Sequence, residues 1–183
     1  MLAKLRKELL APLRGTIVDV GAGTGANFIH FSEGANVIAL EPDRSMASRI
    51  RLKLRRARAK IDVRIDDDSA LDRIAERSID AVVTTLVLCT VADPAVTLRR
   101  IKRVLKPTGK LVVLEHVRSQ GTMGKVQDVI APAWRAIGDG CNLNRNTKTT
   151  IAEAGFDVGD LHTIRITRIP PIQYLLSGAA AVP

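Results

Sequence analysis

The chain has 183 residues, of which 46% are hydrophobic and 3% aromatic, and its formal net charge is +9. This length suits one well-cored domain, so we expect residues 1–183 to form a single α/β domain with a core of Val, Ile, Leu and Ala. No apolar run approaches the roughly 20 residues of a membrane span, and the first residues lack a signal-peptide core. The two cysteines, Cys89 and Cys141, make neither a disulfide framework nor a zinc site. We therefore expect a cytoplasmic protein with reduced thiols and no bound metal.

The first residues predict a short amphipathic helix. Residues 2–10 place leucines on one side and basic side chains elsewhere, and Pro12 and Gly15 end the helix. We expect residues 1–15 to serve as a short lid or packing element ahead of the first strand.

An apolar run beginning at about Thr16 ends in an acid, Asp19, and is followed by three alternating glycines, Gly21, Gly23 and Gly25. The run predicts a strand buried on both faces of a parallel sheet. Glycines directly after it let the backbone turn sharply and approach a ligand closely. The stretch therefore predicts a ligand-binding loop after the first strand.

The rest of the chain alternates between helical and extended patterns. Further strands are predicted at 35–40, 61–65, 79–85, 110–117, 161–169 and 172–176. Helices are predicted at 26–32, 44–59, 70–76, 93–105, 125–137 and 147–154, with an apolar loop at 86–91. This alternation predicts a doubly wound, mostly parallel sheet.

Capping and turn residues set several of these boundaries. Asp93-Pro94 is a strong helix start, because Asp caps the helix and Pro suits its first position. The acidic turn at 66–69 is expected to cap the helix over 70–76, and 106–109 to form a turn before the fifth strand. Pro132 is expected to interrupt the helix over 125–137.

Seven basic residues are concentrated at 49–60, mostly within the predicted helix over 44–59. A solvated helix face is the favoured interpretation, while RNA or an anionic membrane surface remains open as a partner. No aromatic residues interleave with the charges, which argues against base stacking, and we expect no DNA binding.

Two nucleotide cofactors compete for the glycine loop. Gly21, Gly23 and Ala26 satisfy the dinucleotide pattern, and Glu41 could bind ribose hydroxyls. The same loop satisfies a Gly-X-Gly-X-Gly pattern for S-adenosylmethionine (SAM). Asp19 favours SAM, because a carboxylate there would oppose a pyrophosphate but attract the cationic amino group and sulfonium of SAM.

The stretch at 18–25 resembles motif I of the class I SAM-dependent methyltransferases, and the order of elements is similar to theirs. The resemblance implies a Rossmann-like sheet of seven strands in the order 3-2-1-4-5-7-6, with strand 7 antiparallel. Residues 115–117, 132–134, 139–143 and 154–156 are similar to the subgroup that includes alkyl-thiol methyltransferases. That subgroup borders the ubiquinone and menaquinone methyltransferases and the phospholipid N-methyltransferases.

The resemblance also implies three groups of cofactor-binding residues. The glycine loop would hold the methionine portion through Asp19, Gly21, Ala22, Gly23, Thr24, Gly25 and Asn27. Ribose and adenine would contact Glu41, Pro42, Asp43, Met46, Asp68 and Ser69. The methionine and the transferring methyl would be bordered by Thr85, Leu86 and Leu88.

Methyl transfer from a sulfonium is an in-line displacement, so the protein mainly aligns the reactants and excludes water. His116 is the candidate catalytic base, because it follows Glu115 at the carboxyl end of the fifth strand, where ligands of open α/β sheets gather. Asp139, Cys141 and Asn142 are candidates for the acceptor pocket.

We therefore expect a SAM-dependent methyltransferase whose acceptor is a small molecule: a thiol, a quinone precursor or other phenol, or a lipid-like amine. An RNA methyltransferase is an alternative, although residues 84–87 lack an Asn-Pro-Pro-Tyr type motif. A cofactor-binding domain without catalytic activity is another, since only about fifteen residues precede the first strand. A homodimer is also considered.

Overall fold

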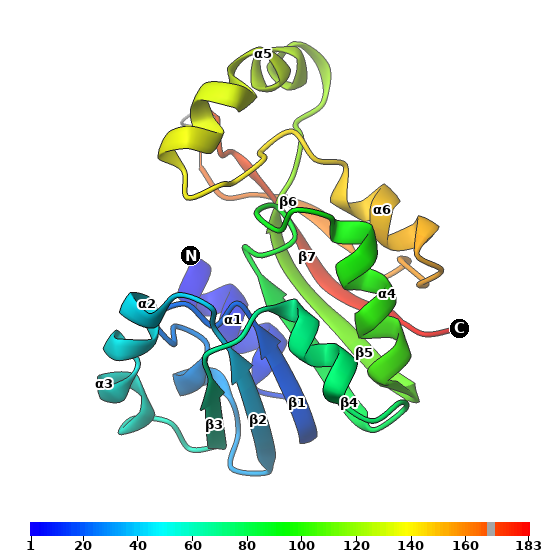
Figure 1. Cartoon of the computed structure of the whole chain (residues 1–183). Coiled ribbons are helices and arrows are strands. Elements are labelled where there is room, and N and C mark those ends of the chain that lie inside the picture. The colour runs from blue at the N-terminus through cyan, green and yellow to red at the C-terminus, as the bar shows by residue number, and fades with distance from the viewer. Residues whose placement is uncertain (168–170) are drawn as a thin grey trace.

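Seven strands form one mixed sheet in the computed structural model of the chain, in the order β3-β2-β1-β4-β5-β7-β6 (Figure 1). The structure describes residues 1–167 and 171–183. The strands are β1 Gly15–Val20, β2 Ala35–Leu40, β3 Lys60–Arg64, β4 Ile79–Thr85, β5 Leu105–His116, β6 His162–Arg165 and β7 Tyr174–Ala181. Strands β1 to β5 pair in parallel, and β7 pairs antiparallel with both β5 and β6. The predicted strand order and the antiparallel seventh strand are confirmed.

Helices cover both faces of this sheet (Figure 1). They are α1 Leu2–Leu10, α2 Arg44–Arg49, α3 Arg51–Leu54, α4 Pro94–Val104, α5 Gly121–Ile137 and α6 Thr147–Glu153, with 3₁₀ turns η1 Phe28–His30 and η2 Asp68–Arg73.

Two separate apolar clusters hold the layers together. Successive residues of β1 point to opposite faces, as a strand requires, so Ile17 enters one cluster and Val18 the other. Leu98 and Ile101 of α4 pack on the face of Val18, and Leu10 of α1 packs on the face of Ile17. The first strand is thus buried from both sides, with its carboxyl end free to carry the glycine loop.

The predicted helix at 26–32 is wrong, since the segment forms only the 3₁₀ turn η1. Phe28 and Phe31, three residues apart, are both fully buried. A 3₁₀ turn has three residues per turn and places such a pair on the same side. Packing of the two rings therefore overrides the longer helix.

The predicted helix at 44–59 is also too long. The structure has α2 and α3 instead, and helical structure ends at Leu54. Like charges four residues apart, such as Arg51 and Arg55, repel one another on a helix surface and weaken it. Within 49–60 every basic side chain except that of Lys53 is exposed. Binding of RNA or of an anionic membrane surface through these residues stays a prediction, and so does the homodimer.

Two further boundaries differ from expectation. The helix expected at 70–76 is the 3₁₀ turn η2, and Asp67 caps it by accepting from the backbone N–H of Ser69. The turn expected at 106–109 lies within β5, where the pairing with β4 shifts register between Ile79 and Ala81. A strand irregularity of this kind accommodates residues 106–109, which have no partners in β4.

Other boundaries follow the local chemistry. Asp93 caps α4 and Pro94 begins it, as predicted. Helix α5 continues through Pro132, so the predicted interruption is wrong. Of the predicted strand at 161–169, β6 forms the first part, whereas 168–169 lie outside the described residues. The strand at 172–176 is longer than predicted, because β7 pairs with β5 as far as Ala181.

None of the helices in the described ranges is long and apolar enough to cross a membrane.

Candidate functional site

A cleft of about 470 Å³ opens at the carboxyl ends of β1, β2, β3 and β4. Its walls come from the glycine loop, the segments after β2 and β3, the loop after β4, and the turn after α5. The lining residues are Val20, Gly21, Gly23, Glu41, Pro42, Asp43, Met46, Asp67, Asp68, Leu86, Val87, Thr90, Val91 and Asp139. This edge is where open α/β sheets bind their ligands.

A smaller cavity of about 210 Å³ shares Gly21, Gly23 and Met46 with the cleft. Its remaining lining residues are Arg6, Ala22, Thr24, Ala26, Asn27 and Thr85. The glycine loop therefore forms a wall of both spaces. Helix α1 contributes the Arg6 side chain to the smaller one, which the sequence analysis did not anticipate.

The three glycines of the loop have positive φ angles, 64° at Gly21, 57° at Gly23 and 77° at Gly25. A Cβ on Gly21 would lie 2.5 Å from Cγ2 of Val87, whereas a Cβ on Gly23 would meet nothing within 4 Å. Gly21 thus allows the loop to pack on the segment after β4. Gly23 leaves open space on the ligand side.

Asp19 lies beneath the loop and is fully buried. Its Oδ1 accepts from Nδ2 of Asn27 at 2.9 Å, while its Oδ2 and the Asn27 Oδ1 have no partner among the described residues. Burial raises the pKa of Asp19 to about 7, although the Asn27 hydrogen bond and the charge of Arg6 act in the opposite direction. Two buried acceptors without partners leave room for a ligand that donates hydrogen bonds.

Glu41, after β2, ties the glycine loop to the start of α2. Its Oε2 accepts from the Gly23 N–H at 2.7 Å, and its Oε1 accepts from the Asp43 N–H at 2.8 Å. Asp43 in turn caps α2 by accepting from the N–H groups of Ser45 and Met46. The carboxylate stands at the cleft with its orientation set by two backbone groups.

The acidic turn after β3 is held by α4. Oδ2 of Asp68 accepts from Oγ1 of Thr97 at 2.7 Å and from Nη1 of Arg100 at 3.0 Å. The neighbouring Asp67 also lines the cleft, and its hydrogen bonds with Ser69 lower its pKa. Ser69 itself lines neither space.

One buried carboxylate shapes the loop after β4. Glu115 accepts from the N–H groups of Val87 and Leu88, both at 3.0 Å, and of Cys89 at 3.3 Å. Burial raises the pKa of Glu115, while these three hydrogen bonds favour its ionised form. Leu86 begins the loop at φ 61°, a left-handed conformation that is unusual outside glycine. Leu86 and Val87 face the cleft, and Leu88 is fully buried.

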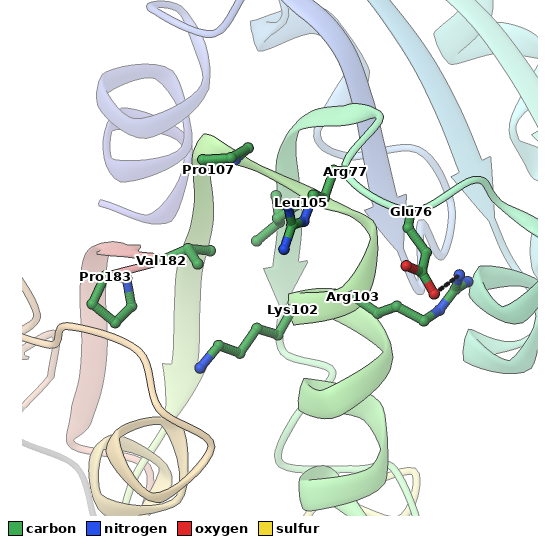
Figure 2. Close-up of a pocket in the computed structure, with 8 residues that line it drawn as sticks. All are labelled: Glu76, Arg77, Lys102, Arg103, Leu105, Pro107, Val182 and Pro183. Carbon is green, nitrogen blue, oxygen red and sulfur yellow. Dashed lines mark ion pairs between the residues drawn. The ribbon is translucent and has the colours of Figure 1, made fainter.

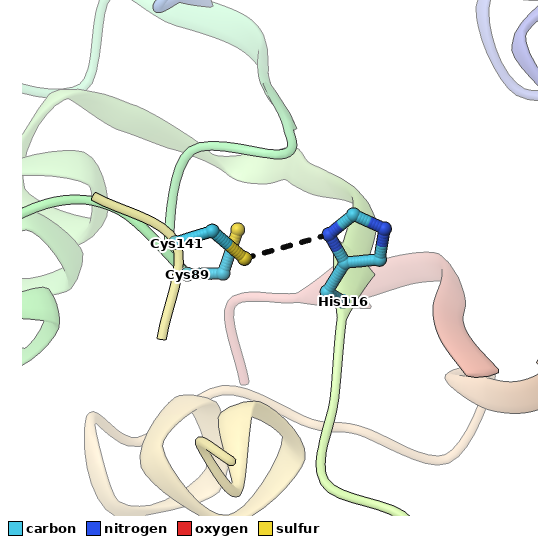
Figure 3. Close-up of side chains that lie close together, drawn as sticks. All are labelled: Cys89, His116 and Cys141. Carbon is cyan, nitrogen blue, oxygen red and sulfur yellow. Dashed lines mark hydrogen bonds between the residues drawn. The ribbon is translucent and has the colours of Figure 1, made fainter. Parts of the chain in front are cut away.

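His116 lies with two cysteines rather than in either space (Figure 3). Its Nδ1 is 3.6 Å from Sγ of Cys141, with Cys89 alongside. The interaction of the two thiols, together with His116, lowers the pKa of Cys141 to about 5, and the same thiol pairing raises the pKa of Cys89. The group therefore favours a thiolate at Cys141.

A separate cavity of about 360 Å³ lies at the other edge of the sheet, where β5 begins (Figure 2). Arg103 and Glu76 form an ion pair at 3.6 Å in its wall. No part of the glycine loop reaches it, so it is not the cofactor site.

The structure brings most of the predicted cofactor residues together. Those that line the cleft or the smaller cavity are Gly21, Ala22, Gly23, Thr24, Asn27, Glu41, Pro42, Asp43, Met46, Asp68, Thr85 and Leu86. Those that line neither are Asp19, Gly25, Ser69 and Leu88, and the predicted catalytic base His116 lines neither space. The expected loop at 86–91 also supplies Val87, Thr90 and Val91. The apolar character of the two valines was the available signal.

The sheet order, the glycine loop and the carboxylates at the ends of β1 and β2 define a Rossmann-like α/β protein with a nucleotide-type cofactor. The unpartnered acceptors at Asp19 and Asn27 and the open face of Gly23 fit SAM, whose amino group is a cationic donor. A family model described as "Methyltransferase domain" matches residues 18–113. The chain belongs to the class I SAM-dependent methyltransferases, as its motif I indicated.

Individual relatives agree with this assignment. The thiol S-methyltransferase TMT1B of Rattus norvegicus is 35% identical over 173 residues, covering 89% of this chain and 67% of that protein. The demethylmenaquinone methyltransferase of Renibacterium salmoninarum is 34% identical over 144 residues, covering 75% of this chain and 57% of that protein. A SAM-dependent methyltransferase from Thermotoga maritima has the same fold, with a TM-score of 0.69 at 18% identity over 99% of this chain and 89% of that one.

Proposed function

We propose that this methyltransferase transfers the methyl group of SAM to the thiol of a small molecule. The observation that carries the proposal is the similarity to a thiol S-methyltransferase along 89% of this chain. The character of the cleft supports it, because Leu86, Val87 and Val91 form an apolar wall. A wall of this kind suits an alkyl thiol better than a highly charged RNA strand.

The proposed cofactor position uses both spaces. The methionine end would lie in the smaller cavity, where Asn27 and the buried charge of Asp19 favour the ammonium and Arg6 favours the carboxylate. The ribose would be bound by Glu41, and the adenine would lie near Met46 in the cleft.

The reaction needs alignment more than a strong base. A thiolate sulfur forms a bond to the methyl carbon while the bond from that carbon to the sulfonium breaks, and the electron pair stays on the cofactor sulfur. The proton of the thiol must leave first, because the thiolate is the nucleophile. The carboxylate of Asp139 in the cleft wall, or water at the open cleft, would accept this proton. His116 lines neither space, and its Nδ1 faces Cys141. Its role as the catalytic base therefore stays a prediction.

The test compares acceptors of different chemistry, among them a thiol and the alcohol that differs from it in one atom. An alkyl thiol, the alcohol of the same skeleton, a catechol and an alkyl amine are incubated with the protein and methyl-labelled SAM, and the products are identified by mass spectrometry. We expect a methyl thioether from the thiol and no product from its alcohol. Methylation of the catechol, the amine or added RNA in place of the thiol would overturn the proposal, as would SAM binding without transfer to any acceptor.

A further inference from the structure

Three side chains with metal-ligating atoms meet next to the cleft, although they are far apart in the sequence (Figure 3). Cys89 lies in the loop after β4, His116 is the last residue of β5, and Cys141 follows α5. Their two sulfurs and one imidazole nitrogen all lie within 4.8 Å of one another. Within the described ranges, no other group of three or more His, Cys, Asp or Glu side chains has this arrangement.

The dimensions of the cluster match those of a tetrahedral zinc site. Zinc–sulfur bonds of about 2.3 Å and zinc–nitrogen bonds of about 2.0–2.1 Å, opened to the tetrahedral angle, place sulfur and nitrogen about 3.6 Å apart. The distance from Cys141 Sγ to His116 Nδ1 is 3.6 Å. Two sulfurs on one zinc ion would be about 3.8 Å apart. Separations of at most 4.8 Å need only a small side-chain rotation to reach that value.

The donor set selects the kind of ion. Two thiolates and an imidazole suit Zn²⁺, whereas Mg²⁺ and Ca²⁺ prefer oxygen ligands. Cys89 is 0% exposed and Cys141 is 6% exposed, so two thiolates, the form in which cysteines bind a metal, would be costly there without a cation. A divalent cation cancels both charges. The half-buried His116 leaves a side from which an ion can enter.

The surroundings favour an ordered site. The apolar side chains of Leu143 and Trp134 pack around the two cysteines and limit the access of water. Glu115 accepts from the backbone of Cys89, and Arg145 donates to the carbonyl of Leu88. These two hydrogen bonds hold the peptide group between Leu88 and Cys89, so the Cys89 side chain starts from a fixed backbone position.

We propose that Cys89, His116 and Cys141 bind one Zn²⁺ ion, with the fourth coordination position left for water or another small donor. The two cysteines are distant in sequence and show no ligand spacing, so the sequence predicts no metal, whereas the sheet topology brings them together with His116. The proposal does not depend on the identity of the methyl acceptor.

The test uses metal binding by the full chain, kept reduced and stripped with a chelator. Co²⁺ is titrated as a spectroscopic substitute for Zn²⁺. We expect one Co²⁺ per chain, with thiolate-to-cobalt charge-transfer absorption and the strong visible bands of tetrahedral cobalt, and displacement by Zn²⁺. Cys141→Ser and His116→Gln should each weaken binding by more than about 100-fold, beyond what the loss of an outer-shell partner costs.

The matched control is His162→Gln, which changes an exposed histidine of β6 and should bind Co²⁺ as the wild type does. Circular dichroism and thermal unfolding show whether each variant is folded, and Zn²⁺ should raise the unfolding temperature of the wild type and of His162→Gln only. Absence of thiolate-to-cobalt absorption in the folded wild type would overturn the proposal. Unchanged affinity in folded Cys141→Ser and His116→Gln would do the same, because it would place the ion elsewhere.

Discussion

Substituting Gly23 by alanine separates the stability of the glycine loop from its binding role. Gly23 has φ 57°, and a Cβ there would meet no atom within 4 Å. The only cost in the free protein is therefore the left-handed conformation of an alanine, about 1–2 kcal/mol. The added methyl group would project into space that we assign to the cofactor. Forcing a methyl into an occupied space costs about 1–3 kcal/mol, which corresponds to a loss of affinity of about 5-fold to 150-fold.

The chain offers a close control at the start of α5. Gly121 has φ 61°, and a Cβ there would also meet nothing within 4 Å, yet this residue lines neither space. Gly121→Ala should lose the same stability in denaturant unfolding while its affinity for SAM, measured by calorimetry, stays that of the wild type. Equal SAM affinity in Gly23→Ala and Gly121→Ala would refute our placement of the cofactor against the loop.

Three other substitutions test the electrostatics of the site. Burial raises the pKa of Asp19 from 3.8 to about 7, so between these pH values the folded protein holds a proton that the unfolded chain releases. The free energy of unfolding should therefore decrease as the pH rises from about 4 to 7, by up to about 1.4 kcal/mol per pH unit. Denaturant unfolding of Asp19→Asn should lack this component, and identical pH profiles for the two proteins would contradict the pKa. Glu41→Ala should lose SAM affinity in calorimetry by at least tenfold, about 1.4 kcal/mol, because both the ribose partner and the anchor of the Gly23 N–H are removed; wild-type affinity would exclude Glu41 from the site. Glu115→Ala leaves three backbone N–H groups without their acceptor. Each group that stays buried costs about 1–3 kcal/mol, so the midpoint of thermal unfolding should drop by many degrees. A midpoint near that of the wild type would mean that water replaces the carboxylate.

The sheet could be predicted from the sequence because its strands are encoded locally. Apolar runs, turn residues and the Asp93-Pro94 start marked the elements, and the motif I resemblance supplied the strand order. The short elements could not be predicted in the same way. Whether 26–32 forms a helix or a 3₁₀ turn is decided by the burial of Phe28 and Phe31 against the sheet, which is a tertiary effect.

In the candidate site, too, the locally encoded residues could be predicted and those that depend on tertiary packing could not. Most predicted residues of motif I and of the strand ends line the cleft or the smaller cavity, because the carboxyl ends of parallel strands meet at one edge of the sheet. Arg6 was missed because nothing in the first helix shows which side chain reaches the loop. The burial of Asp19 and the meeting of His116 with Cys141 depend on packing between distant segments. Neither leaves a pattern in the sequence.

The carboxylate of Glu115 has a consequence for how the two neighbouring sites respond to each other. It holds three successive N–H groups of one loop, in which Val87 lines the cleft that we assign to the cofactor and Cys89 belongs to the thiol cluster. A ligand that shifts the loop on one side therefore alters the geometry offered on the other. Thermodynamic linkage requires such an effect to be reciprocal, so an occupant of the thiol cluster and the cofactor would change each other's affinity by the same factor.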